Sequence, residues 1–397
     1  MTRYRLDPTP AQEAVLWVHC AHARFIWNLA VEQHSYWYPG RKSAPRYVQQ
    51  CRQLTEARAA FDWLAAGSHM VQQQALRDFA QAMANSFAGT HRRPTWRKAG
   101  RHEGFRIVAH KPDAVRRLSR KVGEVRVPKV GWVRFRWSRQ VPQGAKSYRV
   151  TRDRAGRWHI AFAAIPAPTQ SPSNGAVVGV DRGVAVSAAL STGELLQVSG
   201  LGEGERRRLV RLQRRLARAQ RGSKRRRKVR SAIARLKARE TDRRKDWVEK
   251  TSTALARRFD VIGVEDLNVR AMTSSAKGTV DEPGRGVRQK AGLNRGILAN
   301  GWGQLVVRLE HKAPSRVVKV NPAYTSRRCS ACGTVDREAR ESQAVFRCRS
   351  CGYTGNADVN AARNIEHAAG HAVSAREGPG VARPEHREPQ HDLLLSR

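Results

Sequence analysis

Hydrophobic positions recur at two different periods along this chain, and the change of period divides it. In two stretches before residue 90, apolar side chains return every three or four residues, as they do on the buried face of a helix. After residue 90 they alternate with polar side chains, several of them arginines, which is typical of half-buried strands in a small antiparallel barrel. The pattern therefore predicts a first strand at residues 1–10, a helical domain at 11–90 and a β-barrel domain at 91–170.

Apolar strands and helices alternate in the second half of the chain, after a linker rich in Pro and Ser near residue 170. Val177–Asp181 and Val261–Glu265 are apolar strands that each end in an acid. Between residues 205 and 245 leucines keep helical spacing within the most basic part of the chain, and Gly222 marks a break between two helices. This alternation predicts an α/β domain.

The chain carries a formal net charge of +42 over 397 residues, from 75 Lys and Arg against 33 Asp and Glu. Such an excess repels itself in a compact protein unless a polyanion binds, so nucleic acid is the expected partner. The 40% of hydrophobic residues is enough for folded cores. No run reaches the ~20 apolar residues of a membrane-spanning helix, and the N-terminus lacks a signal-peptide core. We therefore expect a cytoplasmic protein without a membrane partner.

Three acidic residues stand where a carboxylate is costly to bury. Asp181 and Glu265 each close an apolar strand, and Asp358 stands at the predicted start of a helix, beside Asn360 and Asn364. An ionised group in or beside a sheet core needs a cationic partner to offset its desolvation. Carboxylate oxygens suit Mg²⁺, and two ions about 3.5–4 Å apart would support in-line cleavage of a phosphodiester. The alternative is that each acid pairs with one of the many arginines.

Four of the six cysteines form two Cys-x2-Cys pairs that are fifteen residues apart: Cys329, Cys332, Cys348 and Cys351. Each pair is followed by a glycine, which allows a tight turn that aims both thiolates inward. Four sulfur ligands complete a closed tetrahedral zinc site, which is structural rather than catalytic. The alternative is a redox dithiol.

The basic helices between residues 205 and 245 predict a surface that follows a nucleic-acid backbone. Helices this positive repel each other unless phosphate binds them, although the alternative is that they are simply solvated faces. The side chains expected to contact nucleic acid here are Arg207, Arg211, Arg214, Arg225 and Arg226.

Four motifs stand in a specific order: GVDRGV around Asp181, GVEDLNV around Glu265, the paired Cys-x2-Cys motifs, and GNADVNAARNI around Asp358. This set resembles the split RuvC nuclease domain of the TnpB family, nucleases of bacterial insertion sequences that are similar to type V CRISPR effectors. The N-terminal RYRLDPTPAQ, the stretch NRGILANGWGQLVVRLEHKA and TSRRCSACG also resemble that family.

The resemblance implies an α/β fold of the ribonuclease-H-like (RuvC) class with an inserted zinc ribbon, preceded by a helical recognition domain and a small β-barrel wedge domain. The nuclease domain would be split between residues 171–320 and 357–366, with the ribbon at 321–356. Residues 367–397, rich in Gly, Pro, His and charge, are predicted to be disordered.

The resemblance also implies an RNA-guided DNA endonuclease of a bacterial transposon. Such an enzyme binds a guide RNA made from the transposon end and reads a short motif beside a double-stranded DNA target. Carried over by motif, Asp181, Glu265 and Asp358 would be catalytic acids that bind two Mg²⁺ ions, and the four cysteines would bind structural Zn²⁺. Arg327 or Arg328 would contact the scissile phosphate.

Two alternatives remain at this stage. One is a transposase or nuclease that acts without a guide, and a requirement for RNA distinguishes it. The other is a regulator that binds nucleic acid on the same fold without cleaving it. The complete acid set weighs against the regulator, because a pure binder has no reason to keep three carboxylates that repel one another. The sequence does not indicate an oligomeric state.

Overall fold

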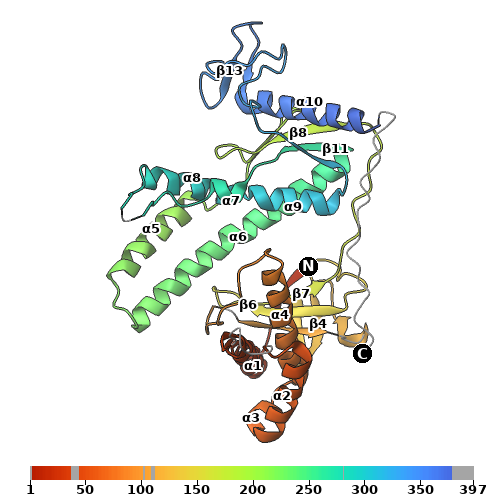
Figure 1. The fold of residues 1–397 in the computed structure, drawn as a ribbon, viewed down its shortest axis with the longest axis vertical. Coiled ribbons are helices and arrows are strands. Elements are labelled where there is room, and N and C mark those ends of the chain that lie inside the picture. The colour runs from red at the N-terminus through yellow and green to blue at the C-terminus, as the bar shows by residue number, and fades with distance from the viewer. Residues whose placement is uncertain (1, 37–43, 102, 109–111, 280, 378–397) are drawn as a thin grey trace. The chain divides into compact units, whose positions relative to one another are not determined.

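The structure is a computed structural model that describes residues 2–36, 44–101, 103–108, 112–279 and 281–377 (Figure 1). The chain divides into two compact units, each described by itself below. The first contains Met1–Pro166 and Gly204–Ala238, and the second contains Ala167–Glu203 and Arg239–Arg397. Within the described residues, no helix is both long and apolar enough to cross a membrane.

Seven antiparallel strands form the sheet of the first unit, in the order β2-β6-β7-β1-β5-β4-β3. The predicted alternation holds, since Val133 and Phe135 are buried while Arg134 and Arg136 are exposed. The N-terminal strand pairs on both sides and so lies inside the sheet. The strands are β1 (Thr2–Asp7), β2 (Gly104–Val108), β3 (Val115–Arg117), β4 (Val122–Val127), β5 (Gly131–Arg136), β6 (Ser147–Arg152) and β7 (Trp158–Ala163).

The helices of the first unit pack with this sheet around one hydrophobic core, which extends from Tyr4 through Leu16 and Phe79 to Phe162. Thr9 begins the first helix with a capping box, because its side chain accepts from the Gln12 N–H and Gln12 bonds back to the Thr9 N–H. The helices are α1 (Pro10–Ser35), α2 (Tyr47–Ala60), α3 (Asp62–Ala65) and α4 (His69–Phe87), with a 3-10 turn at Pro112–Ala114.

The pattern of hydrophobic positions missed α2 and α3. Only Gln50 and Leu54 of α2 are buried, and only Leu64 of α3. Two buried positions in fourteen residues produce no recognisable helical period. These helices are therefore set by their packing against α1 and α4 and not by their own amphipathic pattern.

A five-stranded sheet lies between two layers of helices in the second unit (Figure 1). Strands β8, β11 and β12 are parallel, whereas β9 and β10 are antiparallel to their neighbours. The order is β10 (Leu195–Leu196), β9 (Ala188–Leu190), β8 (Val177–Asp181), β11 (Val261–Glu265) and β12 (Val317–Val320). Helices α6 (Lys224–Arg258) and α9 (Trp302–Lys312) cover one face, and α10 (Ala357–Glu377) covers the other.

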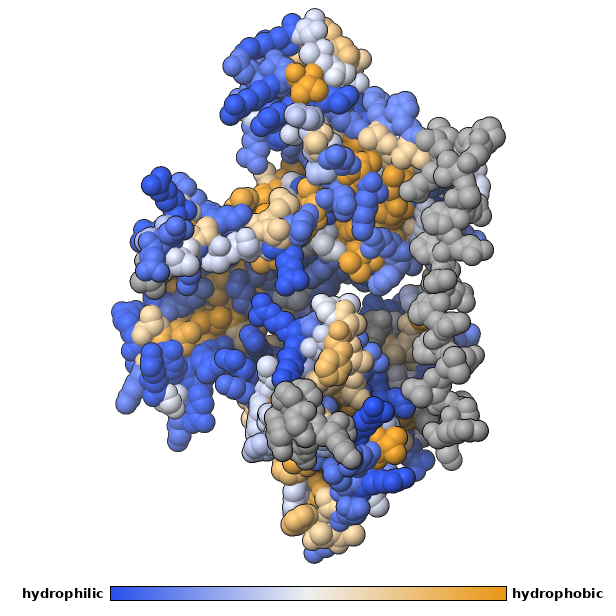
Figure 2. All heavy atoms as spheres, in the orientation of Figure 1, coloured by the Kyte–Doolittle hydropathy of each residue, from blue (hydrophilic) through white to orange (hydrophobic). Residues whose placement is uncertain are grey.

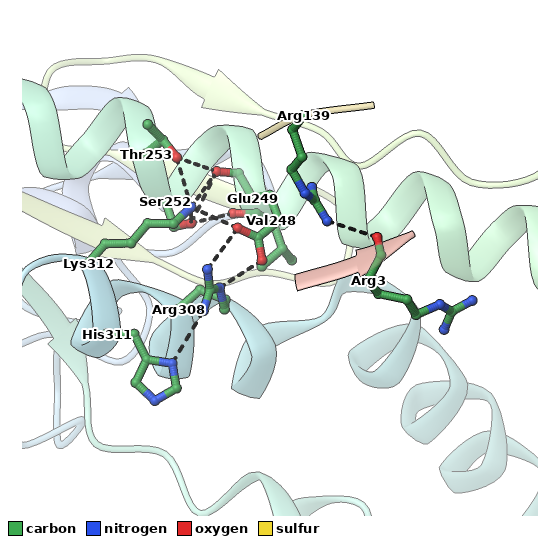
Figure 3. A network of polar contacts seen from close by, with 9 residues as sticks. All are labelled: Arg3, Arg139, Val248, Glu249, Ser252, Thr253, Arg308, His311 and Lys312. Atoms are coloured by element: carbon green, nitrogen blue, oxygen red, sulfur yellow. Dashed lines mark hydrogen bonds and ion pairs between the residues drawn. The ribbon is translucent and has the colours of Figure 1, made fainter. Parts of the chain in front are cut away.

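An ion-pair network fastens α6 to α9 (Figure 3). The ammonium group of Lys312 donates to the Glu249 carbonyl and to the hydroxyls of Ser252 and Thr253, each at 2.8 Å. The Glu249 carboxylate also pairs with Lys312 at 3.0 Å and with Arg308 at 2.7 Å. The network therefore satisfies a largely buried lysine and fixes how the two helices lie under the sheet.

The two basic helices predicted between residues 205 and 245 are present as α5 (Glu203–Arg218) and the longer α6. Gly222 lies in the turn between them with a φ of 83°, a left-handed conformation that glycine adopts without strain. Hydrophilic side chains dominate the surface of this hairpin (Figure 2). The remaining elements are α7 (Val269–Met272), α8 (Val287–Asn300), β13 (Val345–Arg347) and β14 (Thr354–Asn356).

The last helix is longer than the sequence predicts. Helix α10 continues to Glu377, so the predicted disorder is wrong for residues 367–377. Ile365 and Ala369 of this helix pack on Val318 and Val320 of β12, and this buried contact extends the helix past residue 366. Residues 378–397 lie outside the described residues.

Two glycines in the middle of the second sheet allow α10 to lie directly on it. Gly179 of β8 and Gly263 of β11 are partners in the strand register. A Cβ atom on Gly179 would lie 1.9 Å from the Ala362 carbonyl oxygen, and one on Gly263 would lie 2.8 Å from the Ala369 Cβ atom. Because backbone cannot yield at such distances, any side chain here would push the helix away.

We expect Gly179→Ala to destabilise the second unit by about 1–3 kcal/mol, the usual cost of overpacking, because the new methyl group would overlap the α10 backbone. Urea unfolding measures the loss. Gly303→Ala in α9 is the matched control, since no atom lies within 4 Å of its added Cβ. Equal stability of the two variants would contradict the close packing of α10.

Candidate metal centres and nucleic-acid interface

Asp181 and Glu265 end two neighbouring strands at the same level of the sheet. Strands β8 and β11 are parallel, and their register pairs Val180 with Val264 immediately before the two acids. Side chains alternate between the faces of a strand, so both acids lie on the face where the sheet glycines receive α10. The strand ends therefore present two carboxyl groups toward that helix.

Asp358 reaches the same place from the helix. It lies in the first turn of α10, four residues before Ala362, whose carbonyl group lies over Gly179. One helical turn spans about 5.4 Å, close to the ~6.6 Å that two strand residues cover between Gly179 and Asp181. The structure thus brings Asp181, Glu265 and Asp358 together, and we call these three residues the acid cluster.

Burial and the neighbouring acids act on Asp181 in the same direction. Burial raises the pKa of Asp181 to about 7, and the charges of Glu265 and Asp358 contribute to the rise, while Arg340 and Arg182 oppose it. The contributions of Glu265 and Asp358 show that negative charge from the two other acids reaches Asp181. Oxygen ligands that carry such charge suit a divalent cation, which would relieve the repulsion.

Three polar side chains that the sequence analysis did not select contact the acid cluster. The Thr325 hydroxyl donates to a carboxylate oxygen of Glu265 at 2.7 Å, and Arg340 donates to a carboxylate oxygen of Asp358 at 2.8 Å. Arg182 donates to the backbone carbonyl of Glu265. Arg182 directly follows Asp181 in the sequence, which is a signal for it, whereas no local pattern marks Thr325 or Arg340.

In metal-free protein, we expect stability to fall as pH rises from about 4 to about 7. The folded state keeps the Asp181 proton up to a pKa of about 7, whereas the unfolded chain releases it near the ordinary value of ~4. The folded state binds more protons in this window, so raising the pH favours unfolding. Urea unfolding in EDTA tests this against Asp181→Asn, which lacks the titrating group. The same pH dependence in both proteins would contradict it.

The four cysteines converge on one point. All four Sγ atoms lie within 4.8 Å of one another, and none is in a disulfide. Sγ atoms of opposite pairs are 3.7 Å apart between Cys329 and Cys351 and 3.6 Å apart between Cys332 and Cys348. Tetrahedral ligands at Zn–S distances of about 2.3 Å would be about 3.8 Å apart. The cysteines can therefore hold a metal ion such as zinc.

The turn that each Cys-x2-Cys pair needs is present. Gly333 and Gly352 have φ angles of 78° and 73°, in the left-handed region that favours glycine. Their N–H groups donate to the carbonyls of Cys329 and Cys348 at 2.9 and 3.1 Å. The predicted role of the glycine after each pair is confirmed.

Cys348→Ser is expected to lose a metal ion and to lower the melting temperature, because the ribbon has few other buried contacts to hold it. Metal analysis of the purified protein and a thermal melt provide the two measurements. Cys51→Ser, at a free cysteine of α2, controls for the exchange itself. Equal metal content in both variants would show that the cysteines do not bind the ion.

Two asparagines join the first cysteine turn to the helix that carries Asp358. Asn360 accepts from the Ser330 N–H at 2.9 Å and donates to the Arg328 carbonyl at 2.8 Å. Asn364 donates to the carbonyls of Arg328 and Thr325 at 2.7 and 2.9 Å. Hydrogen bonds therefore join the first cysteine turn to the helix that contributes Asp358 to the acid cluster. The side chains of Arg327 and Arg328 are exposed at this turn.

The arginines of α5 and α6 that were predicted to contact nucleic acid differ in their burial. Arg226 is partly buried, and it donates to the carbonyls of Leu216 and Ala219 at 2.7 and 2.8 Å. These bonds satisfy carbonyl groups at the C-terminal end of α5 and join α6 to α5. This is a structural role that the sequence analysis did not predict. The others are exposed: Arg207, Arg211, Arg214 and Arg225.

Comparison with known proteins assigns the chain to a family. Family models match residues 302–365 ("Cas12f1-like, TNB domain"), 147–276 ("Probable transposase") and 1–43 ("Helix-turn-helix domain"). Over 382 residues the chain is 37% identical to "Putative RNA-guided DNA endonuclease InsQ" of Escherichia coli (strain K12), covering 94% of this chain and 92% of that protein. The chain belongs to the TnpB family.

Further relatives agree with this membership. A Streptomyces pristinaespiralis protein named "Putative RNA-guided DNA endonuclease" is 33% identical to this TnpB-family chain over 381 residues, covering 94% of the chain and 90% of that protein. The solved structure "Cryo-EM structure of the Cas12f1-sgRNA-target DNA complex" has the same fold, with a TM-score of 0.51 at 14% identity, over 90% of this chain and 81% of that one. The matched family regions contain all three acids and all four cysteines.

Proposed function

We propose that this TnpB-family protein is an RNA-guided DNA endonuclease of a bacterial transposon that cuts its target by metal-dependent hydrolysis of a phosphodiester. The acid cluster carries the proposal, because it collects three carboxyl groups from two strand ends and one helix in a surplus of negative charge. A protein of net charge +42 that only bound nucleic acid would gain nothing from such a site. The names of the full-length relatives support the same activity.

In the proposed reaction Asp181, Glu265 and Asp358 would be the ligands of two Mg²⁺ ions. Bound there, the ions would supply Lewis-acid stabilisation of the attacking and leaving oxygens. Thr325 holds one oxygen of Glu265 and leaves the other for a ligand. Arg340 lies beside Asp358 with a guanidinium group suited to a phosphate oxygen. These residues bind and orient, while base pairing with the guide selects the target.

The fold suits this assignment. The strand order β10-β9-β8-β11-β12, with three parallel strands and a helix carrying the third acid, supports a ribonuclease-H-like (RuvC) nuclease domain. The sheet β1–β7 would form the wedge domain, and α1–α4 the recognition domain. Zn²⁺ in the cysteine site would be structural, because four sulfur ligands leave no open position.

The positive charge of the protein indicates which partners it binds. Guide RNA from the transposon end and double-stranded target DNA are the polyanions that would neutralise the basic surface, including the exposed arginines of α5 and α6. Arg327 and Arg328 would contact the DNA backbone from the cysteine turn that borders the acid cluster. Reduced thiolates suit the cytoplasm, where we place the reaction.

The guide is tested by expressing the protein with its native flanking DNA and sequencing the RNA that stays bound through moderate salt. We expect one discrete RNA that maps to the element's end and continues into adjacent sequence. Heterogeneous cellular RNA that salt removes would instead indicate indiscriminate binding by a basic protein, and DNA cleavage without any RNA would indicate an unguided transposase.

Asp181→Ala is expected to reduce cleavage of a matched DNA target by at least ~10³-fold while guide RNA binding is unchanged, because the proposed role of the carboxylate is to hold metal for the cleavage step. Single-turnover cleavage and RNA binding are measured on the same preparation. Asp246→Ala is the control, since its carboxylate is exposed and pairs with the exposed Lys250. Loss of RNA binding in Asp181→Ala would show that the residue is structural.

A further inference from the structure

Arg182 is buried more completely than a charged side chain normally is. It directly follows Asp181 at the end of β8, and only 4% of its surface is exposed. Arginine is almost never fully buried unless its charge is paired. The side chain is therefore held in the interior by its surroundings, beside the acid cluster.

The guanidinium group of Arg182 connects the two strands that carry acids. One terminal N–H donates to the backbone carbonyl of Glu265, beyond the last register pair of β8 and β11. Its Nε atom is buried and has no hydrogen-bond partner among the described residues. A buried donor without a partner costs free energy.

The backbone that follows Arg182 is held from the other side. Trp302 donates from its indole nitrogen to the Gly183 carbonyl at 3.0 Å, and the Asn300 side-chain amide donates to the Val184 carbonyl at 2.9 Å. The Ser187 hydroxyl donates to the other end of the Asn300 amide at 2.6 Å. The junction of α8 and α9 therefore holds the backbone of the loop that follows Arg182.

Acidic groups surround the guanidinium. Glu265, Asp181 and Asp266 all interact with its charge. Carboxyl groups that repel one another separate unless a positive charge or a rigid link holds them, and Arg182 supplies both at the strand ends. Arg340 also adds positive charge, through its ion pair with Asp358 and its effect on Asp181, but no hydrogen bond from its side chain to either strand end is seen among the described residues.

We propose that Arg182 is a positioning residue for the nuclease reaction, which holds the ends of β8 and β11 together so that Asp181 and Glu265 are ready to receive metal. This inference rests on the proposed function. It assigns to the arginine a role in the geometry of the acid cluster and no contact with the scissile phosphate. Arg182 acts through its hydrogen bond to the backbone carbonyl oxygen of Glu265.

The test measures metal binding without requiring DNA cleavage. Fe²⁺ replaces Mg²⁺ in the protein bound to its guide RNA, and with ascorbate and peroxide it cuts the polypeptide nearest the ion. Fragments that end near residues 181 and 265 report occupancy of the acid cluster. We compare wild type with Arg182→Met, Arg182→Lys and Arg257→Met, the last of which removes an exposed arginine of α6. Thermal melts and target DNA cleavage accompany each titration.

For Arg182→Met we expect half-maximal fragment yield to need about 10- to 100-fold more Fe²⁺, the usual effect of removing a group that orients metal ligands. DNA cleavage should fall in parallel while target binding is unchanged. Arg182→Lys, which keeps the charge, should recover part of both, and Arg257→Met should match wild type. If Arg182→Met does not fold, Arg182→Lys alone decides by the same titration.

Two results would overturn the inference in distinguishable ways. Unchanged Fe²⁺ dependence in a folded Arg182→Met protein, even with a lower melting temperature, would limit the residue to a role in stability and leave the proposed function intact. Absence of fragments near residues 181 and 265 in wild type itself would overturn the metal site of the proposed function, and the role of Arg182 with it.

Discussion

The direct contact between α10 and the central strands is the constraint on which the rest of the second unit depends. Gly179 and Gly263 place no side chain of β8 or β11 beneath α10 at these two positions, so the helix lies directly against the two strands. Only at that distance does Asp358 reach the two strand-end acids. The same helix is joined to the metal ribbon through Asn360 and Asn364. One packing contact therefore fixes both candidate metal centres relative to each other.

This contact creates an electrostatic problem that the surrounding residues partly solve. Burial is the main cause of the raised pKa of Asp181, and the repulsion among three carboxyl groups brought together from separate elements adds to it. Arg182, which follows Asp181, and Arg340, which lies between the two cysteine pairs, both add positive charge at the acid cluster. They reduce the repulsion without removing it. The remaining negative charge is what a divalent cation would neutralise. The site is thus negative inside a chain whose net charge is +42.

The arginines of this protein fall into two groups, one exposed to solvent and one turned into the fold. Most are exposed on helices and strands, where their charge is available to a polyanion. A few are turned inward and satisfy groups of the fold, as Arg226 does at the end of α5 and Arg182 does at the end of β11. Composition alone treats both kinds as nucleic-acid ligands, and only their hydrogen bonds separate them.

The acids, the cysteine pairs and the basic helices could be identified from the sequence, because each is a local pattern of residue type and spacing. An apolar strand that ends in an acid, or two cysteines three residues apart, keeps its meaning whatever lies around it. The helices α2 and α3, the extension of α10 to Glu377 and the contacts of Arg340 had no such signal. They depend on burial against partners that are distant in the sequence, and burial of that kind is decided only when the chain folds.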